Sequence, residues 1–354
     1  MKRRSLFAAA FAVALAPFAH AQMAAPAPTA AAPTAAVSPI PMNKRIVLLV
    51  DEIRQVRNLP AIVAERLGYL KGNGFEVTMM NIRDEVPHAQ MLMDGQIDAI
   101  MAYYQHNLVN HSDGRDTQAI VTLGVTPGAK VLVANHAKGK YKTPADLKGA
   151  RIIVGGPNSS KTAVGNALLL AGGHTVNDYI RLPTEGKEKN AAALREGRAD
   201  LFVAPVPEGD YYEKEGVASV FVDLRSVEGT KKQFGTLFPT STVYMASERI
   251  KAHPEIAQHL ADAFVRALHY MNTHSAEQIA ALLPEDFFKK DREGFMTALK
   301  QELPMFANDG RMPADGAQYE HRVISALNAK VKPVVLEGTY TNRFVDAALK
   351  RLGQ

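Results

Sequence analysis

The sequence of 354 residues contains no cysteine. Disulfide bonds, zinc sites built on thiolates and cysteine nucleophiles are therefore excluded. Histidine does not take their place, because His106 and His111 are five positions apart and would not share one helix face. The HExxH and GxSxG motifs are also missing. We expect no metal site, no cofactor and no catalytic residue, and hence a protein that is not an enzyme.

Beyond its first residues the chain has no apolar run that approaches the roughly 20 residues needed to span a bilayer. The shorter apolar run at 6–16 follows basic residues at 2–4 and precedes a small-x-small site at 19–21. This pattern predicts a secretory signal peptide over residues 1–21, removed at maturation. Residues 22–42 are mostly alanine, proline and threonine, which can bury little surface, so we expect a disordered linker there.

A run of basic residues is missing as well. The formal net charge is +5, and removal of the signal peptide with its three positive charges leaves +2. Lysine and arginine are scattered among aspartate and glutamate. We therefore expect no binding to nucleic acid.

Residues 143–173 are the most informative stretch of the chain. A capped turn with Pro144 at its first helical position precedes an apolar, β-branched run at 151–154, which predicts a buried strand. A loop rich in glycine and capping residues then leads into apolar side chains at helical spacing. Backbone N–H groups at the start of such a helix, with the positive end of its dipole, favour an anion. Ser160 stands where a nucleotide-binding P-loop needs glycine, so no nucleotide site is expected.

Strands and helices alternate along the rest of the chain, as in a parallel α/β sheet. The predicted strands are 44–50, 75–82, 97–102, 128–135, 152–154, 179–182, 199–204, 220–223 and 238–247, and helices are predicted at 59–70, 88–94 and 190–196. From His253 to Leu352 the pattern is mainly helical. Five apolar residues there share one helix face and are expected in the core: Ile256, Leu260, Phe264, Leu268 and Met271.

Several phrases of the sequence resemble the periplasmic solute-binding proteins of the nitrate/sulfonate/taurine (aliphatic sulfonate-binding-like) ABC importer family. The run PAIVAERLGYLKGNGFEV at 60–77 and the run MDGQIDA at 93–99 resemble phrases of the family's first lobe. Residues 143–154, 158–172 and 191–205 resemble phrases of its second lobe. The similarity covers roughly residues 45–283. Asp98 and Asp200 follow the family's repeated "G..Da" phrase, and we interpret both as structural residues.

The resemblance implies an α/β fold of the type II periplasmic-binding-protein class, with two lobes joined by two crossing strands. Residues 43–127 and 240–354 are expected to form the discontinuous first lobe, and residues 128–239 the second. The implied function is capture of a small organic anion, a sulfonate or carboxylate, by hinge closure between the lobes. The protein would be a monomer that delivers its ligand to an inner-membrane permease, with ATP hydrolysed by a separate subunit. Since a lipidated cysteine is absent, the exported protein would not be lipidated and would diffuse in the periplasm.

In open α/β sheets the ligand lies beyond the carboxyl ends of the strands, so the loops there supply the candidate residues. Arg54 and Arg57 could give paired donors to a carboxylate or sulfonate, while Tyr103 and Tyr104 could stack on the ligand. The helix that begins near Ser160 could bind the anion through its first residues. The full set of expected ligand-binding residues is Arg54, Arg57, Asn58, Tyr103, Tyr104, Thr126, Asn158, Ser159, Ser160, Pro205 and Thr240.

Other interpretations of the same residues stay open. Each arginine could be a solvated loop residue, each tyrosine could pack at a strand end, and Ser159, Ser160 and Thr162 could simply cap their helix. Asp51 and Glu52 could neutralise the arginines, which would favour a neutral or zwitterionic ligand such as taurine or a pyrimidine precursor. A ligand sensor or an enzyme on the same fold are the remaining alternatives.

Overall fold

We describe the protein from a computed structural model, which describes residues 45–51, 53–82, 88–157, 159–206, 208–289, 291–327 and 330–353. Residues Ile40–Gln354 make up one compact unit. The predicted signal peptide and linker lie outside the described residues. Within the described ranges, no helix combines the length and the apolar character that a membrane crossing requires.

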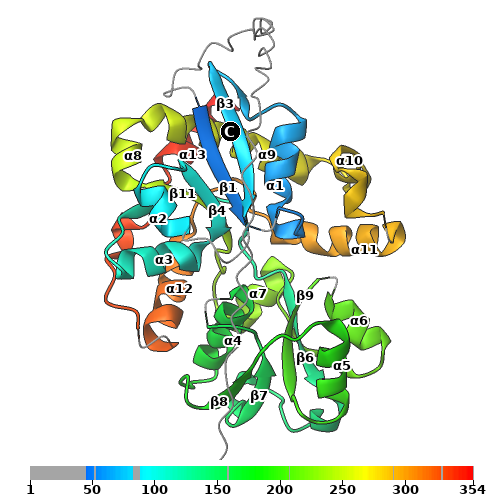
Figure 1. Cartoon of the computed structure of the whole chain (residues 1–354). Helices are drawn as coiled ribbons and strands as arrows, with labels where there is room; N and C mark the ends of the chain where they lie inside the picture. The colour runs from blue at the N-terminus through cyan, green and yellow to red at the C-terminus, as the bar shows by residue number, and fades with distance from the viewer. Residues whose placement is uncertain are drawn as a thin grey trace, which may run out of the picture. The chain divides into compact units, whose positions relative to one another are not determined.

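The first sheet has six strands in the order β2-β3-β1-β4-β11-β5 (Figure 1). These are β1 (Arg45–Asp51), β2 (Lys71–Gly72), β3 (Phe75–Ile82), β4 (Ala99–Tyr103), β5 (Thr117–Thr122) and β11 (Ser241–Ala246). Strand β1 is parallel to β3 and β4, as the alternation of strands and helices predicts. Strand β11 is antiparallel to β4 and β5, because the chain enters it on its return from the second sheet. The predicted parallel sheet is therefore a mixed one.

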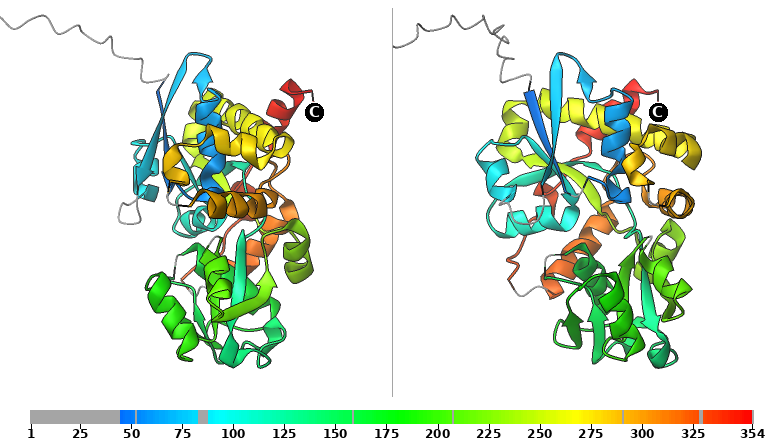
Figure 2. Two further views of the ribbon diagram at one scale, coloured as in Figure 1. Left: turned by 90° about the vertical axis from the view of Figure 1, so that its right-hand side faces the viewer. Right: turned by 45° about the vertical axis from the view of Figure 1, so that its right-hand side comes forward.

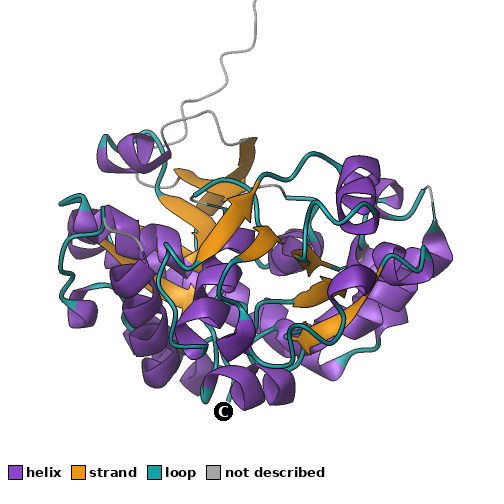
Figure 3. Ribbon diagram, turned by 90° about the horizontal axis from the view of Figure 1, so that it is seen from below, coloured by secondary structure: helices purple, strands orange, loops and turns teal. Residues whose placement is uncertain are grey.

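The second sheet has five strands in the order β10-β6-β9-β7-β8. These are β6 (Ala129–Ala134), β7 (Ala150–Ile153), β8 (Tyr179–Leu182), β9 (Leu201–Pro205) and β10 (Ala218–Asp223). The helices between them are α4 (Ser160–Ala171), α5 (Lys187–Arg195), α6 (Glu208–Lys214) and α7 (Val227–Phe234). Figure 3 shows helices on either side of the strands. Both sheets therefore have helices to cover their apolar faces.

Two buried aspartates have equivalent roles in the two sheets. Asp98 accepts a hydrogen bond from the Val47 N–H at 2.8 Å and a second from the Arg249 guanidinium at 2.6 Å. Asp200 accepts one from the Arg151 N–H at 2.9 Å and another from the Arg151 guanidinium at 2.7 Å. Each carboxylate thus ties a strand end to an arginine, which agrees with the structural role predicted for both.

The two segments that connect the sheets are hydrogen-bonded to each other. The Thr240 N–H donates to Gly124 O at 2.8 Å, and the Phe238 N–H donates to Val125 O at 3.0 Å. The segments pack so closely that a β-carbon on Gly124 would lie 2.2 Å from Thr240 Oγ1. Glycine is therefore required at this position for the two crossings to lie side by side.

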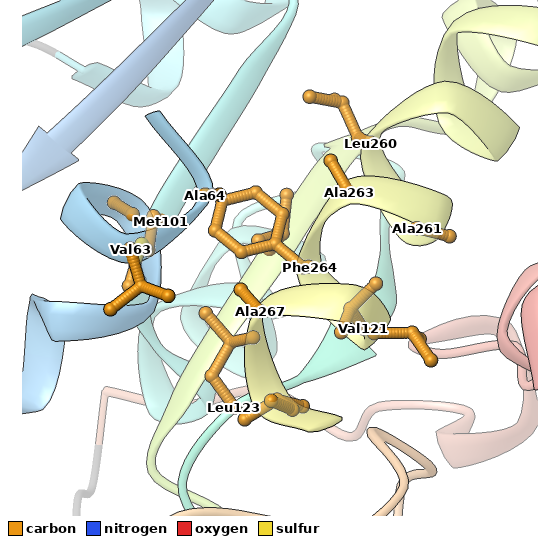
Figure 4. Packing of buried hydrophobic residues seen from close by; sticks show 14 of the residues in the cluster. Val63, Ala64, Met101, Val121, Leu123, Leu260, Ala261, Ala263, Phe264 and Ala267 are labelled. Atoms are coloured by element: carbon orange, nitrogen blue, oxygen red, sulfur yellow. The ribbon is translucent and has the colours of Figure 1, made fainter. Parts of the chain in front are cut away.

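The C-terminal helices complete the core of the first sheet. They are α8 (Ser247–Ala252), α9 (Pro254–Thr273), α10 (Ala276–Leu282), α11 (Arg292–Glu302), α12 (Ala314–Leu327) and α13 (Arg343–Arg351). The predicted stripe of α9 is buried, with Phe264 fully so, and packs among residues of α1 (Leu59–Arg66), β4 and β5 (Figure 4). Helix α13 lies against α9 (Figure 2).

Helix α12 contacts the elements of both sheets. Its Tyr319, Val323 and Leu327 join the apolar cluster of the second sheet, and the Tyr319 hydroxyl donates to Ala167 O of α4 at 2.9 Å. Its Ile324 joins a cluster of the first sheet. The sequence analysis assigned residues 240–354, and hence this whole helix, to the first lobe. Its side chains instead pack against elements of both sheets.

Element boundaries differ from the predicted ones where a local signal was misread. Helix α1 ends at Arg66, not Leu70, because Gly68 has φ +71° and ends the helix before Gly72 is reached. Residues predicted as a loop after β4 form α3 (Tyr104–Ser112). Strand β5 and helices α6 and α7 were not predicted, since each is short and its apolar pattern is weak.

Candidate functional site

A cavity of about 120 Å³ lies beside the crossing segments and is lined by elements of both sheets. A cavity needs about 10–15 Å³ of such volume to hold one water molecule, so this cavity has room for a small ligand. The lining residues come from the turn after β1, the end of β4, the segment that leads into the start of β6, strand β9 and the residue after it, the first half of α4, and the end of α11 with the turn that follows it. The described lining residues are Gln55, Val56, Arg57, Tyr103, Pro127, Gly128, Ala129, Ser160, Lys161, Val164, Val203, Pro205, Val206, Glu302 and Met305.

Arg57 brings a fixed positive charge to the cavity. It lies in the 3₁₀ turn η2 (Val56–Asn58), which joins β1 to α1. Its guanidinium carbon is 6.0 Å from the centre of the Tyr103 ring, within the range of a cation–π interaction, and one N–H donates to the Gln55 side chain. These two neighbours orient the guanidinium, whose planar fork matches a carboxylate or sulfonate.

Tyr103 ends β4 and supplies both an aromatic ring and a hydroxyl at the cavity. The side chain is buried, and its hydroxyl donates to Pro127 O of the first crossing at 3.4 Å. Burial raises the pKa of Tyr103 to about 12, against an opposing effect of Arg57. The phenol therefore stays protonated at physiological pH; its hydrogen is donated to Pro127 O, and its oxygen can accept a hydrogen bond.

The second sheet contributes the start of α4. Ser159 caps this helix: its hydroxyl accepts from the Thr162 N–H at 3.2 Å and donates to Val154 O at 2.7 Å. Ser160 and Lys161 in the first turn line the cavity. The helix dipole and the Lys161 ammonium both favour a negative group at this side. Positive charge thus faces the cavity from both sheets.

Glu302, at the end of α11, is the acidic member of the described lining. Only 4% of the residue is exposed, and its Oε2 has no hydrogen-bond partner within the described residues. Burial raises the pKa of this carboxyl well above its ordinary value, although Arg57 and Arg225 oppose the shift. The carboxyl group therefore stays neutral to a higher pH than an exposed glutamate, and the cavity keeps a positive balance of charge.

Four of the predicted ligand-binding residues line this cavity, namely Arg57, Tyr103, Ser160 and Pro205. Arg54 is exposed and forms an ion pair with Asp286 at 2.9 Å. Tyr104 lies fully buried elsewhere, with its hydroxyl 2.5 Å from Thr339 Oγ1.

The other predicted residues serve the local framework or cannot be placed. Thr126 and Thr240 are buried in the crossings, where the Thr240 hydroxyl donates to Thr126 O at 3.2 Å. Asn58 is buried before α1, and Ser159 is occupied as a helix cap. Asn158 lies outside the described residues, as do Glu52 and the side chain of Asp51.

Sequence reasoning found the right loops but missed several lining residues. Gln55, Pro127 and Lys161 lie next to predicted residues in the same segments, so the prediction named the right segments and missed these side chains. Glu302 and Met305 were not considered, because they lie at and just after the end of α11, far along the chain from the other lining residues. No local pattern marks them, since a glutamate at the end of an amphipathic helix usually faces solvent.

Two α/β sheets, two hydrogen-bonded crossings and a cavity lined from both sides define the two-lobe, type II fold of periplasmic binding proteins. The sequence matches the profile of the NMT1/THI5-like family over residues 55–278, more than half of its length, and the protein belongs to this family. The predicted fold and family resemblance are thereby confirmed. Comparison with individually curated proteins gives no significant match.

Solved structures support the same fold. A protein from Bordetella bronchiseptica RB50 is 26% identical with a TM-score of 0.73, covering 88% of this chain and 98% of that one. The nitrate-binding protein NrtA from Synechocystis PCC 6803 is 14% identical with a TM-score of 0.65, covering 87% and 89%. A putative sulfonate-binding SsuA from Methylobacillus flagellatus KT is 17% identical with a TM-score of 0.62, covering 88% and 95%.

The fold is also used by an enzyme. The desulfurization enzyme DSZB is 16% identical with a TM-score of 0.61, covering 87% of this chain and 99% of that one. The fold alone therefore does not separate binding from catalysis, and the chemistry of the cavity has to decide.

Proposed function

We propose that this protein is the periplasmic substrate-binding component of an ABC importer and that it holds a small organic anion, a sulfonate or a carboxylate, in this cavity. The ligand would be enclosed by closure of the two lobes and delivered to an inner-membrane permease, whose separate ATPase subunit drives transport. The protein would act as a non-lipidated monomer after removal of its signal peptide.

The observation that carries this proposal is the convergence of positive groups on one cavity. Arg57 comes from the first sheet, and Lys161 with the start of α4 comes from the second. An anion bound between them would contact both sides at once. Its charge would therefore favour the closed arrangement over an open one, which is how a ligand drives hinge closure.

The polar groups of the cavity are better suited to binding than to catalysis. Tyr103 keeps its proton because its pKa is raised to about 12, so it is not a base. The lining contains no serine–histidine or cysteine–histidine pair within the described residues. We therefore favour a binding role over the enzymatic role of DSZB.

The test is a comparison of two arginines from the same loop. Arg57→Met keeps the apolar stem but removes the cavity's guanidinium, whereas Arg54→Met removes an exposed, ion-paired one and serves as the matched control. Thermal unfolding against alkyl sulfonates, carboxylates, nitrate and amino-pyrimidines identifies the ligand class. A ligand at 100 times its Kd adds about 2.7 kcal/mol of stability, which raises Tm by a few degrees.

We expect Arg57→Met to weaken binding of the best anion by roughly tenfold or more, because a hydrogen bond to a charged group contributes about 1.5–3 kcal/mol. Arg54→Met should leave Kd within about twofold of the wild type, since exposed ion pairs contribute little. Equal Kd values for the wild type and Arg57→Met would contradict the assignment of this cavity. A response to amino-pyrimidines alone would keep the binding role and overturn the anion.

A further inference from the structure

Arg225 and Gln301 form a hydrogen bond that joins the two lobes. Arg225 follows β10 of the second sheet, whereas Gln301 lies in α11, whose Leu299 belongs to the apolar core of the first sheet. The Arg225 guanidinium donates from Nη1 to the Gln301 side-chain oxygen at 2.5 Å. Neither residue is among the described residues that line the cavity, so the contact lies outside the candidate site.

The Arg225 side chain is held in place within its own lobe. Its Nε donates to Asp223 Oδ1 at 2.9 Å, and its Nη2 donates to Asp223 Oδ2 at 2.5 Å. Only 19% of the side chain is exposed. Because the planar guanidinium is already fixed by these two bonds, little side-chain freedom is lost when Nη1 meets Gln301. The second lobe thus presents a preorganised donor to the first.

Both sides of this hydrogen bond are anchored to the first crossing segment. On the second-lobe side, the Leu224 N–H donates to Ala129 O at 2.9 Å. On the first-lobe side, the Val125 N–H donates to Met305 O at 2.8 Å. Between these anchors the chain passes through Gly128, whose φ of +59° is one that glycine adopts without strain. The hydrogen bond therefore brackets the segment that must change conformation if the lobes move, and such a change would separate its two partners.

We propose that the Arg225–Gln301 hydrogen bond is a latch that stabilises the arrangement in which both lobes line the cavity. A bond from a guanidinium to a neutral amide is stronger than one between two neutral groups but lacks the attraction of an ion pair. It can therefore bias the lobes and still break when they open. Because the latch lies outside the cavity, it would raise the affinity for every ligand by the same factor. This effect on affinity rests on the proposed function, whereas the effect on the lobes does not.

Two substitutions in the same helix test the latch. Gln301→Met keeps the length of the side chain but removes the acceptor. Lys300→Met is the matched control, because Lys300 pairs with Glu277 of α10 at 2.7 Å and so stays within the first lobe. Arg225→Met, alone and combined with Gln301→Met, completes a double-mutant cycle that cancels the separate loss of the contact to Asp223. Circular dichroism and Tm establish that each variant is folded.

The arrangement of the lobes can be measured without knowing the ligand. The chain has no cysteine, so one spin label can be placed on each lobe through Glu65→Cys in α1 and Lys189→Cys in α5, both exposed. Double electron–electron resonance then gives the distribution of distances between the lobes. We expect Gln301→Met to lower the ratio of the closed to the open population roughly three- to tenfold, and Lys300→Met to leave it unchanged.

Isothermal titration with the anions that bind the wild type measures the effect on affinity. Gln301→Met should raise Kd by the same factor, roughly three- to tenfold, for every one of them, and mainly through faster dissociation. The double-mutant cycle should show Arg225 and Gln301 to be coupled in ligand binding. A factor that differs between ligands would place Gln301 at the ligand and overturn the latch.

The outcomes separate this inference from the proposed function. If Gln301→Met and Lys300→Met give the same distance distribution and the same Kd as the wild type, the latch is refuted while anion binding stands. A changed distribution with unchanged Kd values would overturn the effect on affinity. If no anion binds the wild type and Arg57→Met has no effect, the proposed function fails, and the distances in the ligand-free protein still decide whether the two residues hold the lobes together.

Discussion

The contact between the two crossing segments at Gly124 allows a sharp test of how the lobes are joined. A β-carbon added at Gly124 would lie 2.2 Å from Thr240 Oγ1 and 3.4 Å from the Ser241 nitrogen. The backbone of Gly124 does not have a positive φ, so alanine is conformationally allowed there. Any effect of Gly124→Ala therefore reports the close approach of the segments and not backbone strain.

The magnitude follows from overpacking at a buried site. Thr240 is fully buried and its hydroxyl is held by Thr126 O at 3.2 Å, so it cannot rotate away without losing that bond. Forcing an extra methyl group into a packed site costs about 1–3 kcal/mol. We expect Gly124→Ala to lower Tm by several degrees in differential scanning calorimetry. Ligand affinity should fall too, because these segments join the two lobes whose closure we propose.

A second variant identifies the cause. Thr240→Ala removes the Oγ1 atom that the new methyl group would meet, at a cost of about 1 kcal/mol for the lost hydrogen bond. The double variant Gly124→Ala/Thr240→Ala should then be more stable than the sum of the single effects predicts, by about 1 kcal/mol or more. Strict additivity of the two free-energy changes would refute the close contact and with it the description of the crossings as a packed pair.

Two further substitutions test structural roles. Burial would raise the pKa of Asp200, but hydrogen bonds from Arg151 and His136 outweigh burial and hold this pKa well below the usual range. The ionised form thus stabilises the fold above about pH 4, and this contribution is lost as the pH falls below that value. Asp200→Asn should therefore lower the free energy of unfolding by about 1–3 kcal/mol at neutral pH. The same variant should flatten the acid limb of the stability–pH curve. Tyr104→Phe removes the hydroxyl bonded to Thr339 and should cost about 1 kcal/mol in denaturant unfolding. Ligand Kd should not change, and a weaker affinity would place Tyr104 at the site after all.

The sequence alone predicts those features whose signals are local. Pro144 opens its turn as expected, and the strand, loop and helix of residues 150–171 form as β7 and α4. The apolar stripe of α9 is buried throughout, because a period of 3.6 residues leaves one face for the core. The phrases around Asp98 and Asp200 indicated the family. Each aspartate accepts hydrogen bonds from a strand N–H and from an arginine side chain in its own sheet.

Tertiary structure decides which side chains reach the cavity. Arg54 and Arg57 are equivalent choices in the sequence, yet only Arg57 lies in the turn that faces Tyr103. Tyr103 and Tyr104 are adjacent but separate at the junction of β4 and α3, where the first faces the cavity and the second faces Thr339. Successive side chains diverge at such a junction because the backbone changes from extended to helical there.

Glu302 shows the same limit more strongly. It stands about 245 positions after Arg57, in a part of the chain whose pattern predicts only amphipathic helices, and no spacing rule relates the two. The folded chain brings the end of α11 to the cavity that Arg57 also lines, and the Glu302 side chain is buried there. The sequence therefore determined the family, the local elements and the positive side of the site. The buried acidic group of the cavity emerged only from packing, because burial is a property of the three-dimensional surroundings and not of the residue.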